Sequence, residues 1–210
     1  MAKETPAVRT TRRMHGRGNV IADLIKANRS CRRFDESHPV PATLLMELVD
    51  LARLSASAAN LQPLKYILSS APATNVDIFE CLKWAGYLET WAGPEPGERP
   101  GAYIIILHDT RICPTVDCDH GIAAQSILLG AREKGLAGCM IAAVNRPKLG
   151  AALGMADHYK ILLVLALGKP AEQIVIESLN DDGDIRYWRS ADMVHHVPKR
   201  SLEKMIVARF

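Results

Sequence analysis

The sequence lacks the motifs by which many enzymes are recognised. It contains no G-x-S-x-G nucleophile turn, no H-E-x-x-H zinc motif and no G-x-x-x-x-G-K-[ST] phosphate loop. No G-x-G-x-x-G follows an apparent strand, so a dinucleotide-binding βαβ unit is not supported. The sequence therefore shows no evident set of residues for nucleophilic or acid–base catalysis. The chemistry must be sought in residues that bind a ligand.

Aromatic residues and long apolar runs are also scarce. Only 5% of the 210 residues are Phe, Trp or Tyr, so aliphatic side chains must form the core. No apolar run approaches the roughly 18 residues that a membrane span requires, and we expect no membrane association. The length favours one domain with a sizeable core, which we assign to residues 21–210.

The cysteines form no disulfide framework. They are five, an odd number, and their spacing is irregular, which is typical of a reducing compartment and predicts a cytoplasmic protein. Cys113, Cys118 and His120 lie close together in the sequence. Zinc sites usually pair such ligands at a spacing of about two to four residues and add a second pair, which is missing. We therefore expect no metal site.

Excess positive charge is confined to the start of the chain. The net charge is +3 overall and +4 over residues 1–20, so the remainder carries −1. We expect residues 1–20 to be a basic, flexible tail and the folded part to be close to neutral. A nucleic-acid role for this tail is the less favoured alternative, and we expect no nucleic-acid partner. Arg12 and Arg13 are not followed by an apolar run, so no export signal is expected.

Helices and strands alternate irregularly along the chain. Helices are expected over residues 20–30, 38–55, 75–91, 119–135 and 145–154, with Asp119 and Asn145 as caps of the last two. Strands are expected over 64–70, 102–107 and 161–168, and a hairpin over 185–199. Residues 139–144 form a short strand or a turn, and residues 204–210 could form a terminal strand. Residues 56–63 and 92–101 form loops, the second a possible lid. This order favours a layered α+β fold over a wound parallel sheet.

Three segments carry residues suited to a phosphate and a flat heterocycle. In "NRSCRRF" (28–34), Arg29, Ser30 and Arg32 offer several N–H and O–H donors to an anion. The alternative is an exposed helix end whose arginines pair with Asp35 and Glu36.

The other two segments lie further along the chain. In "SAANLQP" (57–63), Ser57, Asn60 and Gln62 present groups that can bind the edge of a heterocycle, or simply form an amide-rich turn. Lys199 and Arg200 add positive charge, or form a solvated basic turn.

Together, these segments resemble the FMN-dependent nitroreductase family. The resemblance rests on "RSCRRF", "SASAANLQP", the helix "GIAAQSILLGAREKGL", the turn "GCMIAAVN" and the strand end "LALGKPAE", followed by a basic segment near the C-terminus. These motifs occur in the family's order over about residues 21–205. Departures from the family pattern are Leu64 after Gln-Pro, Ala56 before the loop serine, and an Ala-Ala pair in the turn.

The resemblance implies a three-layer α/β/α sandwich with a mixed, mostly antiparallel sheet. It also implies a homodimer with exchanged terminal segments and FMN at the subunit interface. By position, Arg29, Ser30 and Arg32 would hold the phosphate and ribityl chain, completed by Lys199 and Arg200. Side chains of the loop and backbone N–H groups of the turn would contact the flavin; these residues are Ser57, Asn60, Gln62, Ala142 and Ala143.

The implied activity is a flavin-dependent oxidoreductase. FMN would be reduced by NADH or NADPH and reoxidised by a nitroaromatic, a quinone or a related planar acceptor in a ping-pong cycle, without an obligatory catalytic side chain. One alternative is a specialised flavin enzyme of the same fold, of the dehalogenase or flavin-fragmenting type. Another is a non-catalytic flavin-binding protein.

Overall fold

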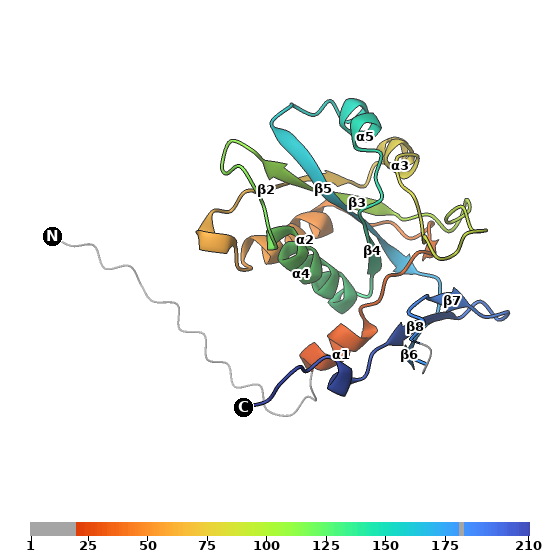
Figure 1. The fold of residues 1–210 in the computed structure, drawn as a ribbon. Coiled ribbons are helices and arrows are strands. Elements are labelled where there is room, and N and C mark those ends of the chain that lie inside the picture. The colour runs from red at the N-terminus through yellow and green to blue at the C-terminus, as the bar shows by residue number, and fades with distance from the viewer. Residues whose placement is uncertain (1–19, 181–182) are drawn as a thin grey trace.

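One antiparallel sheet forms the centre of the molecule (Figure 1). The computed structural model describes residues 20–180 and 183–210, so the predicted basic tail lies almost wholly outside the described residues. The strands of this sheet are β1 (Phe34–Asp35), β2 (Leu64–Ser69), β3 (Ala102–Asp109), β4 (Ala137–Ile141) and β5 (Tyr159–Pro170). Their order is β1-β5-β3-β2, with β4 also paired to β5, and every pair is antiparallel.

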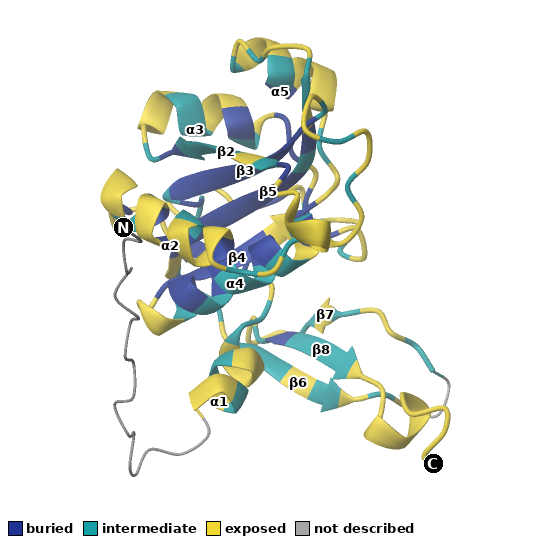
Figure 2. Cartoon of the chain, turned by 90° about the vertical axis from the view of Figure 1, so that its left-hand side faces the viewer, coloured by how far each residue is buried: buried dark blue, intermediate teal, exposed yellow. Residues whose placement is uncertain are grey.

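Helices cover both faces of this sheet, giving the three layers expected (Figure 2). On one face lie α2 (Ala42–Arg53) and α4 (Asp119–Glu133), and on the other lie α3 (Pro72–Phe79) and α5 (Arg146–Ala152). The central strand β3 is buried throughout, and its alternate residues serve the two cores. Ile104 and Ile106 pack towards α2 and α4, whereas Tyr103 and Ile105 pack towards α3 and α5.

A second, smaller sheet lies beside this body together with α1 (Val20–Ala27) (Figure 2). It consists of β6 (Ile174–Ser178), β8 (His195–Lys199) and β7 (Trp188–Arg189), with β7 antiparallel and β6 parallel to β8. The β7–β8 pair confirms the predicted hairpin. Because β6 pairs with β8 in parallel, this small sheet contains both parallel and antiparallel pairs. A short 3₁₀ helix, Leu202–Lys204, follows β8.

Two element predictions are wrong. The helix expected over residues 75–91 ends at Phe79, and the chain then turns back so that Leu82 pairs with Val144 in an isolated bridge. Ala85 has a positive φ of 38°, which is incompatible with a continuing α-helix. Residues 205–210 form no strand and are exposed within this chain.

Two helix-end predictions fared differently. Asn145 caps α5, because its side-chain Oδ1 accepts a hydrogen bond from the N–H of Lys148 at 3.2 Å. Asp119 does not cap α4, whose N-cap is Cys118. The carboxylate of Asp119 instead accepts hydrogen bonds from Ser57 and Ala58, which lie in the loop between α2 and β2. Asp119, at the start of α4, therefore stabilises a loop that is distant in sequence rather than its own helix.

Within residues 20–180 and 183–210, no helix is long and apolar enough to cross a membrane. The same described part of the chain contains no cluster of metal-ligating side chains, and all five cysteines are free.

Candidate functional site

A cavity of about 270 Å³ gathers part of the predicted site. It lies between the segment after α1, the middle of α4, strand β4 and the small sheet. Four of the predicted residues line it: Arg29, Ser30, Arg32 and Lys199. Lys199 comes from the far end of the chain, as the sequence predicts.

Two buried residues hold the "NRSCRRF" segment in place. Ser30 pairs with Gly138 of β4 in a parallel bridge, and the N–H of Cys31 donates to the carbonyl of Gly138 at 3.0 Å. The side chains of Cys31 and Phe34 are buried, and burial raises the pKa of the Cys31 thiol to about 12. Cys31 is therefore an inert packing residue.

Arg29 has an unpaired buried nitrogen. Its Nη2 donates to the carbonyl of Ile25 near the end of α1 at 2.8 Å. Its Nε is shielded from solvent and has no hydrogen-bond partner among the described residues. A buried donor without a partner costs roughly 1–3 kcal/mol, so a ligand or water that accepts this hydrogen bond would stabilise the side chain.

Arg32 is held on several sides. Its Nη1 lies 3.3 Å from the carbonyl oxygen of Ser30 and 3.3 Å from Nε2 of His195. Its guanidinium carbon lies 4.8 Å from the centre of the Tyr187 ring, a cation–π contact. Its backbone N–H donates to the buried carboxylate of Glu172, which also binds Arg189 at 3.0 Å.

The alternative in which these arginines pair with nearby carboxylates does not hold. Asp35 accepts hydrogen bonds from Ser37, and Glu36 accepts them from the backbone of residues 97 and 99. Arg33, the third arginine of the segment, forms an ion pair with Glu98. That hydrogen bond lowers the pKa of Glu98.

Arg200 lies apart from the other predicted phosphate ligands. It lines a different cavity, formed at the ends of β6 and β8 together with Lys204. Lys199 lines both cavities, so the two cavities adjoin at this residue.

The loop of residues 57–62 is ordered but lies outside this cavity. Ser57 donates its hydroxyl proton to Asp119 and accepts the N–H of Gln62 at 2.9 Å. Ala59, Asn60 and Gln62 all have positive φ values, 48°, 55° and 53°, an uncommon backbone that the Asp119 contacts maintain. Asn60 and Gln62 are exposed.

Ala142 and Ala143 lie on an exposed turn directly after β4. The N–H of Lys83 donates to the carbonyl of Ala143 at 2.9 Å, and the N–H of Val144 donates to that of Ala142 at 3.0 Å. The N–H of Ala143 shares a peptide plane with the Ala142 carbonyl and points the opposite way. These two hydrogen bonds therefore set the direction of the backbone N–H and carbonyl groups of the turn.

Strand β4 links this turn to the cavity. Gly138 and Met140 line the cavity, and the two-residue period of a strand places Ala142 next along the same face. Gly138 cannot carry a side chain, because a Cβ would lie 2.6 Å from Leu128 Cδ2 and 2.7 Å from the Ala166 carbonyl oxygen. A ligand in the cavity can extend along β4 towards Ala142.

Eight residues that line the cavity were not among the predicted site residues, and four of these are Gln125, Met140, Tyr187 and His195. Gln125 belongs to a quoted motif and could have been found there. Tyr187 and His195 come from the predicted hairpin region, which carries none of the quoted motifs. The side chain of His195 is buried, its Nδ1 has no partner in the described part of the chain, and burial lowers its pKa to about 4.

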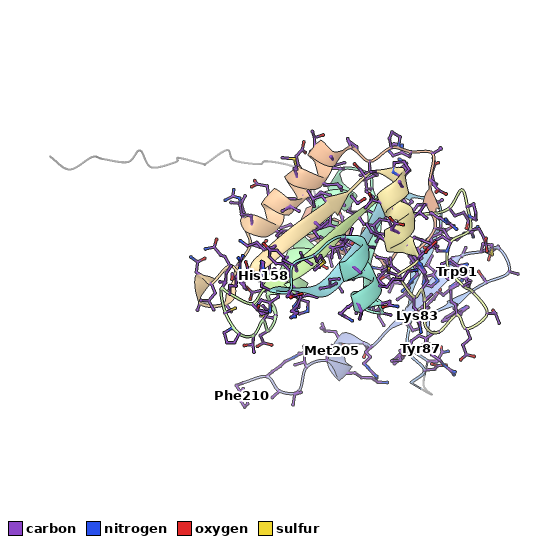
Figure 3. All side chains as sticks on the ribbon, turned by 90° about the horizontal axis from the view of Figure 1, so that it is seen from above. Lys83, Tyr87, Trp91, His158, Met205 and Phe210 are labelled. Carbon is purple, nitrogen blue, oxygen red and sulfur yellow. The ribbon has the colours of Figure 1, made fainter. Side chains whose placement is uncertain are left out.

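A turn-rich segment borders the cavity at Tyr187. The ring of Tyr87 lies 5.0 Å from that of Tyr187, and the guanidinium of Arg189 lies 4.2 Å from the centre of the Trp91 ring. Figure 3 shows Lys83, Tyr87 and Trp91 on one side of the molecule, remote from His158. This segment therefore runs from the Ala142–Ala143 turn towards the small sheet.

The cavity suits a polar ligand with an anionic group. Three of its lining residues are cations, Arg29, Arg32 and Lys199, and none is a carboxylate. The unpaired Nε of Arg29 and Nδ1 of His195 are further buried polar atoms in its wall. The residues present thus fit a phosphorylated group such as FMN.

Comparison with known proteins identifies the family of the chain. The model of the "Nitroreductase family" matches residues 25–86 and 98–169. An iodotyrosine dehalogenase 1 homolog of Caenorhabditis elegans is 25% identical over 188 residues, covering 76% of this chain and 58% of that protein. An oxygen-insensitive NADPH nitroreductase of Helicobacter pylori (strain ATCC 700392 / 26695) is 25% identical over 198 residues, covering 79% and 94%.

A solved structure shows the same fold. An FMN-dependent nitroreductase from Clostridium difficile R20291 superposes with a TM-score of 0.60 at 21% identity, covering 76% of this chain and 91% of that chain. The family model matches well over half of the chain, and the motifs lie on the expected elements. The chain belongs to the nitroreductase family, a family of oxidoreductases.

Proposed function

We propose that this chain is an FMN-dependent oxidoreductase. It takes electrons from NADH or NADPH and delivers them to a nitroaromatic, a quinone or a related planar acceptor. The observation that carries the proposal is the cavity containing Arg29, Arg32 and Lys199 with no carboxylate in its wall. Family membership supports the same assignment.

The phosphate and ribityl chain are assigned to Arg29, Ser30, Arg32 and Lys199. Arginine and lysine supply charge-assisted hydrogen bonds to phosphate oxygens, and the serine hydroxyl suits the polyol. Arg200 lines an adjoining cavity that shares Lys199 with this one, so we propose that it adds positive charge beside the phosphate.

The cofactor, when bound, supplies hydride acceptance and donation. The chain's part is to bind and orient. The backbone N–H of Ala143 is the group placed to stabilise negative charge at the reactive end, because the hydrogen bonds of its turn fix its direction. No side chain is required as an obligatory acid or base, consistent with the absent catalytic motifs.

We further propose that the site is completed by a second copy of the chain. Asn60 and Gln62 are exposed on an ordered, unusual loop, away from the cavity of their own chain. A homodimer would bring this loop to the partner's cavity. The exposed apolar residues near the two ends of the described chain favour an interface there; they include Ile21, Met205, Val207 and Phe210. We assign the protein to the cytoplasm, consistent with its five free cysteines.

Steady-state kinetics test the proposed reaction. The FMN-loaded protein is mixed with NADH or NADPH without air, and its flavin absorbance is expected to bleach. Adding a nitroaromatic or a quinone should restore the absorbance, and initial rates at several concentrations of both substrates should give parallel double-reciprocal plots. A flavin that neither nucleotide reduces would favour the non-catalytic flavin-binding alternative.

Dehalogenation is the second candidate, favoured by the relative from Caenorhabditis elegans. The chain spans 58% of that protein's length, so the comparison covers only part of it. Iodide release from iodotyrosine by the reduced protein separates the two functions. The proposed function predicts turnover of the nitroaromatic or quinone and no catalytic iodide release.

A further inference from the structure

His195 contacts the cation that the proposed function assigns to the phosphate. It begins β8, its backbone N–H donates to the carbonyl of Gln173 at 2.9 Å, and only 1% of its surface is exposed. Its Nε2 lies 3.3 Å from Nη1 of Arg32, and its ring centre lies 5.2 Å from that of Tyr187. His195 and Tyr187 both line the cavity and support the guanidinium of Arg32.

The hydrogen bond to Arg32 requires a neutral imidazole. A guanidinium can only donate, so Nε2 of His195 must accept, and the ring proton must lie on Nδ1. The charged or titratable neighbours of the ring are Arg32, Arg189 and His196. Glu172 binds Arg189 and the backbone of Arg32, and Glu177 binds His196. Burial and the nearby cations therefore keep the ring uncharged at neutral pH.

We propose that His195 is a positioning residue that holds the Arg32 guanidinium towards the phosphate of the cofactor, so that the site selects phosphorylated over unphosphorylated flavin. This inference rests on the proposed function. Without an acceptor at Nε2, Arg32 keeps its charge but loses one of the three contacts that fix the direction of its guanidinium, and a bidentate phosphate contact depends on that direction. Loss of His195 should therefore weaken FMN binding much more than riboflavin binding.

His196 is a matched control on the same strand. Its Nδ1 binds Glu177 at 2.8 Å and its ring stacks on Trp188 at 4.9 Å, with the planes 3° apart. It does not line the cavity. Replacing it removes an imidazole from β8 without touching Arg32.

The test measures the dissociation constants of FMN and riboflavin for four proteins. These are the wild type and the variants His195→Phe, His195→Gln and His196→Phe. We expect His195→Phe to weaken FMN binding about tenfold, as loss of a hydrogen bond to a charged group does, and to leave riboflavin binding within about twofold. His195→Gln restores an acceptor and should recover most of the loss, whereas His196→Phe should leave both constants unchanged.

A double-mutant cycle adds a second readout. His195→Phe in an Arg32→Gln background should cause little further loss of FMN affinity, because the contact is already gone. If the phenylalanine variant does not fold, His195→Leu replaces it with less volume. Equal losses for FMN and riboflavin, or additive losses in the cycle, would overturn the inference. Failure of the wild type to bind FMN would instead overturn the proposed function.

Discussion

At the residue scale, the proposed site contains two arginines, Arg29 and Arg32, that Asp35 and Glu36 do not bind. Asp35 and Glu36 are hydrogen-bonded elsewhere, and Arg33 takes Glu98 as its partner. Arg29 and Arg32 thus keep their charge available to the cavity. The three neighbouring arginines therefore differ in role, because Arg29 and Arg32 line the cavity whereas Arg33 binds Glu98.

Removing Arg29 should weaken FMN binding strongly. A hydrogen bond to a charged group contributes about 1.5–3 kcal/mol, so Arg29→Ala should raise the FMN dissociation constant roughly tenfold to a hundredfold. Fluorescence quenching of FMN measures the constant. Arg53→Ala is the control, because Arg53 forms an exposed ion pair with Asp50 on α2 and should change nothing. An Arg29 variant that binds FMN as the wild type does would contradict the assignment.

The buried His195 should make stability depend on pH. The pKa of His195 is lowered from 6.5 to about 4 in the folded chain, mainly by burial and then by Arg32. Between these values the unfolded chain binds a proton that the folded chain does not, so stability is complete above pH 6.5 and falls as the pH approaches 4. Urea unfolding at pH 7 and pH 5 measures this loss. His195→Gln should lose less stability over that interval, and equal losses would refute the explanation.

At the scale of elements, β4 contributes to the proposed site mainly through its backbone rather than its side chains. Gly138 lets α4 pack closely on the strand, since a Cβ there would meet Leu128 and the Ala166 carbonyl, and its backbone also pairs with Ser30. The same strand leads from the cationic cavity to the Ala142–Ala143 turn. Its position in the sheet thus connects two motifs that are more than 100 residues apart in sequence.

Two alanine substitutions should have opposite effects on stability. Gly138→Ala forces a clash in a packed region and should cost about 1–3 kcal/mol. Gly150→Ala lies in α5, where a Cβ meets no atom within 4 Å, and should stabilise the protein by roughly 0.5–1 kcal/mol. Urea denaturation at equilibrium measures both free energies of unfolding. A stabilising Gly138→Ala would show that this close approach is relaxed in solution.

The sequence was informative where patterns are local. The strand over 102–107 and the Asn145 cap follow from apolar runs and capping chemistry, and both are confirmed. The helix expected over 75–91 failed because Leu82 pairs with Val144, a distant partner that no local pattern records. His195 was missed for the same reason, since its partner Arg32 is 163 residues away. Motif resemblance located Arg29, Ser30 and Arg32 because their spacing is fixed within one short segment.

At the scale of the whole molecule, the proposed composite site predicts complementation between chains. Arg29→Ala should damage the cationic cavity, and Asn60→Ala should damage the loop that we assign to the partner's site. Each homodimer is expected to retain little FMN. A mixed dimer contains one site with both sets of residues intact, so co-expressed, differently tagged chains should recover about one FMN per dimer. Mixed dimers that bind no more FMN than either parent would contradict a shared site.

The most direct test of the central claim is a calorimetric titration of the flavin-free wild-type chain with FMN. The cavity formed by Arg29, Ser30, Arg32 and Lys199 predicts one FMN bound per chain, and it predicts much weaker binding of riboflavin, which lacks the phosphate. It also predicts that affinity for FMN falls as salt concentration rises, because the contacts are ionic. A folded chain that binds no FMN, or that binds riboflavin equally well, would contradict the account.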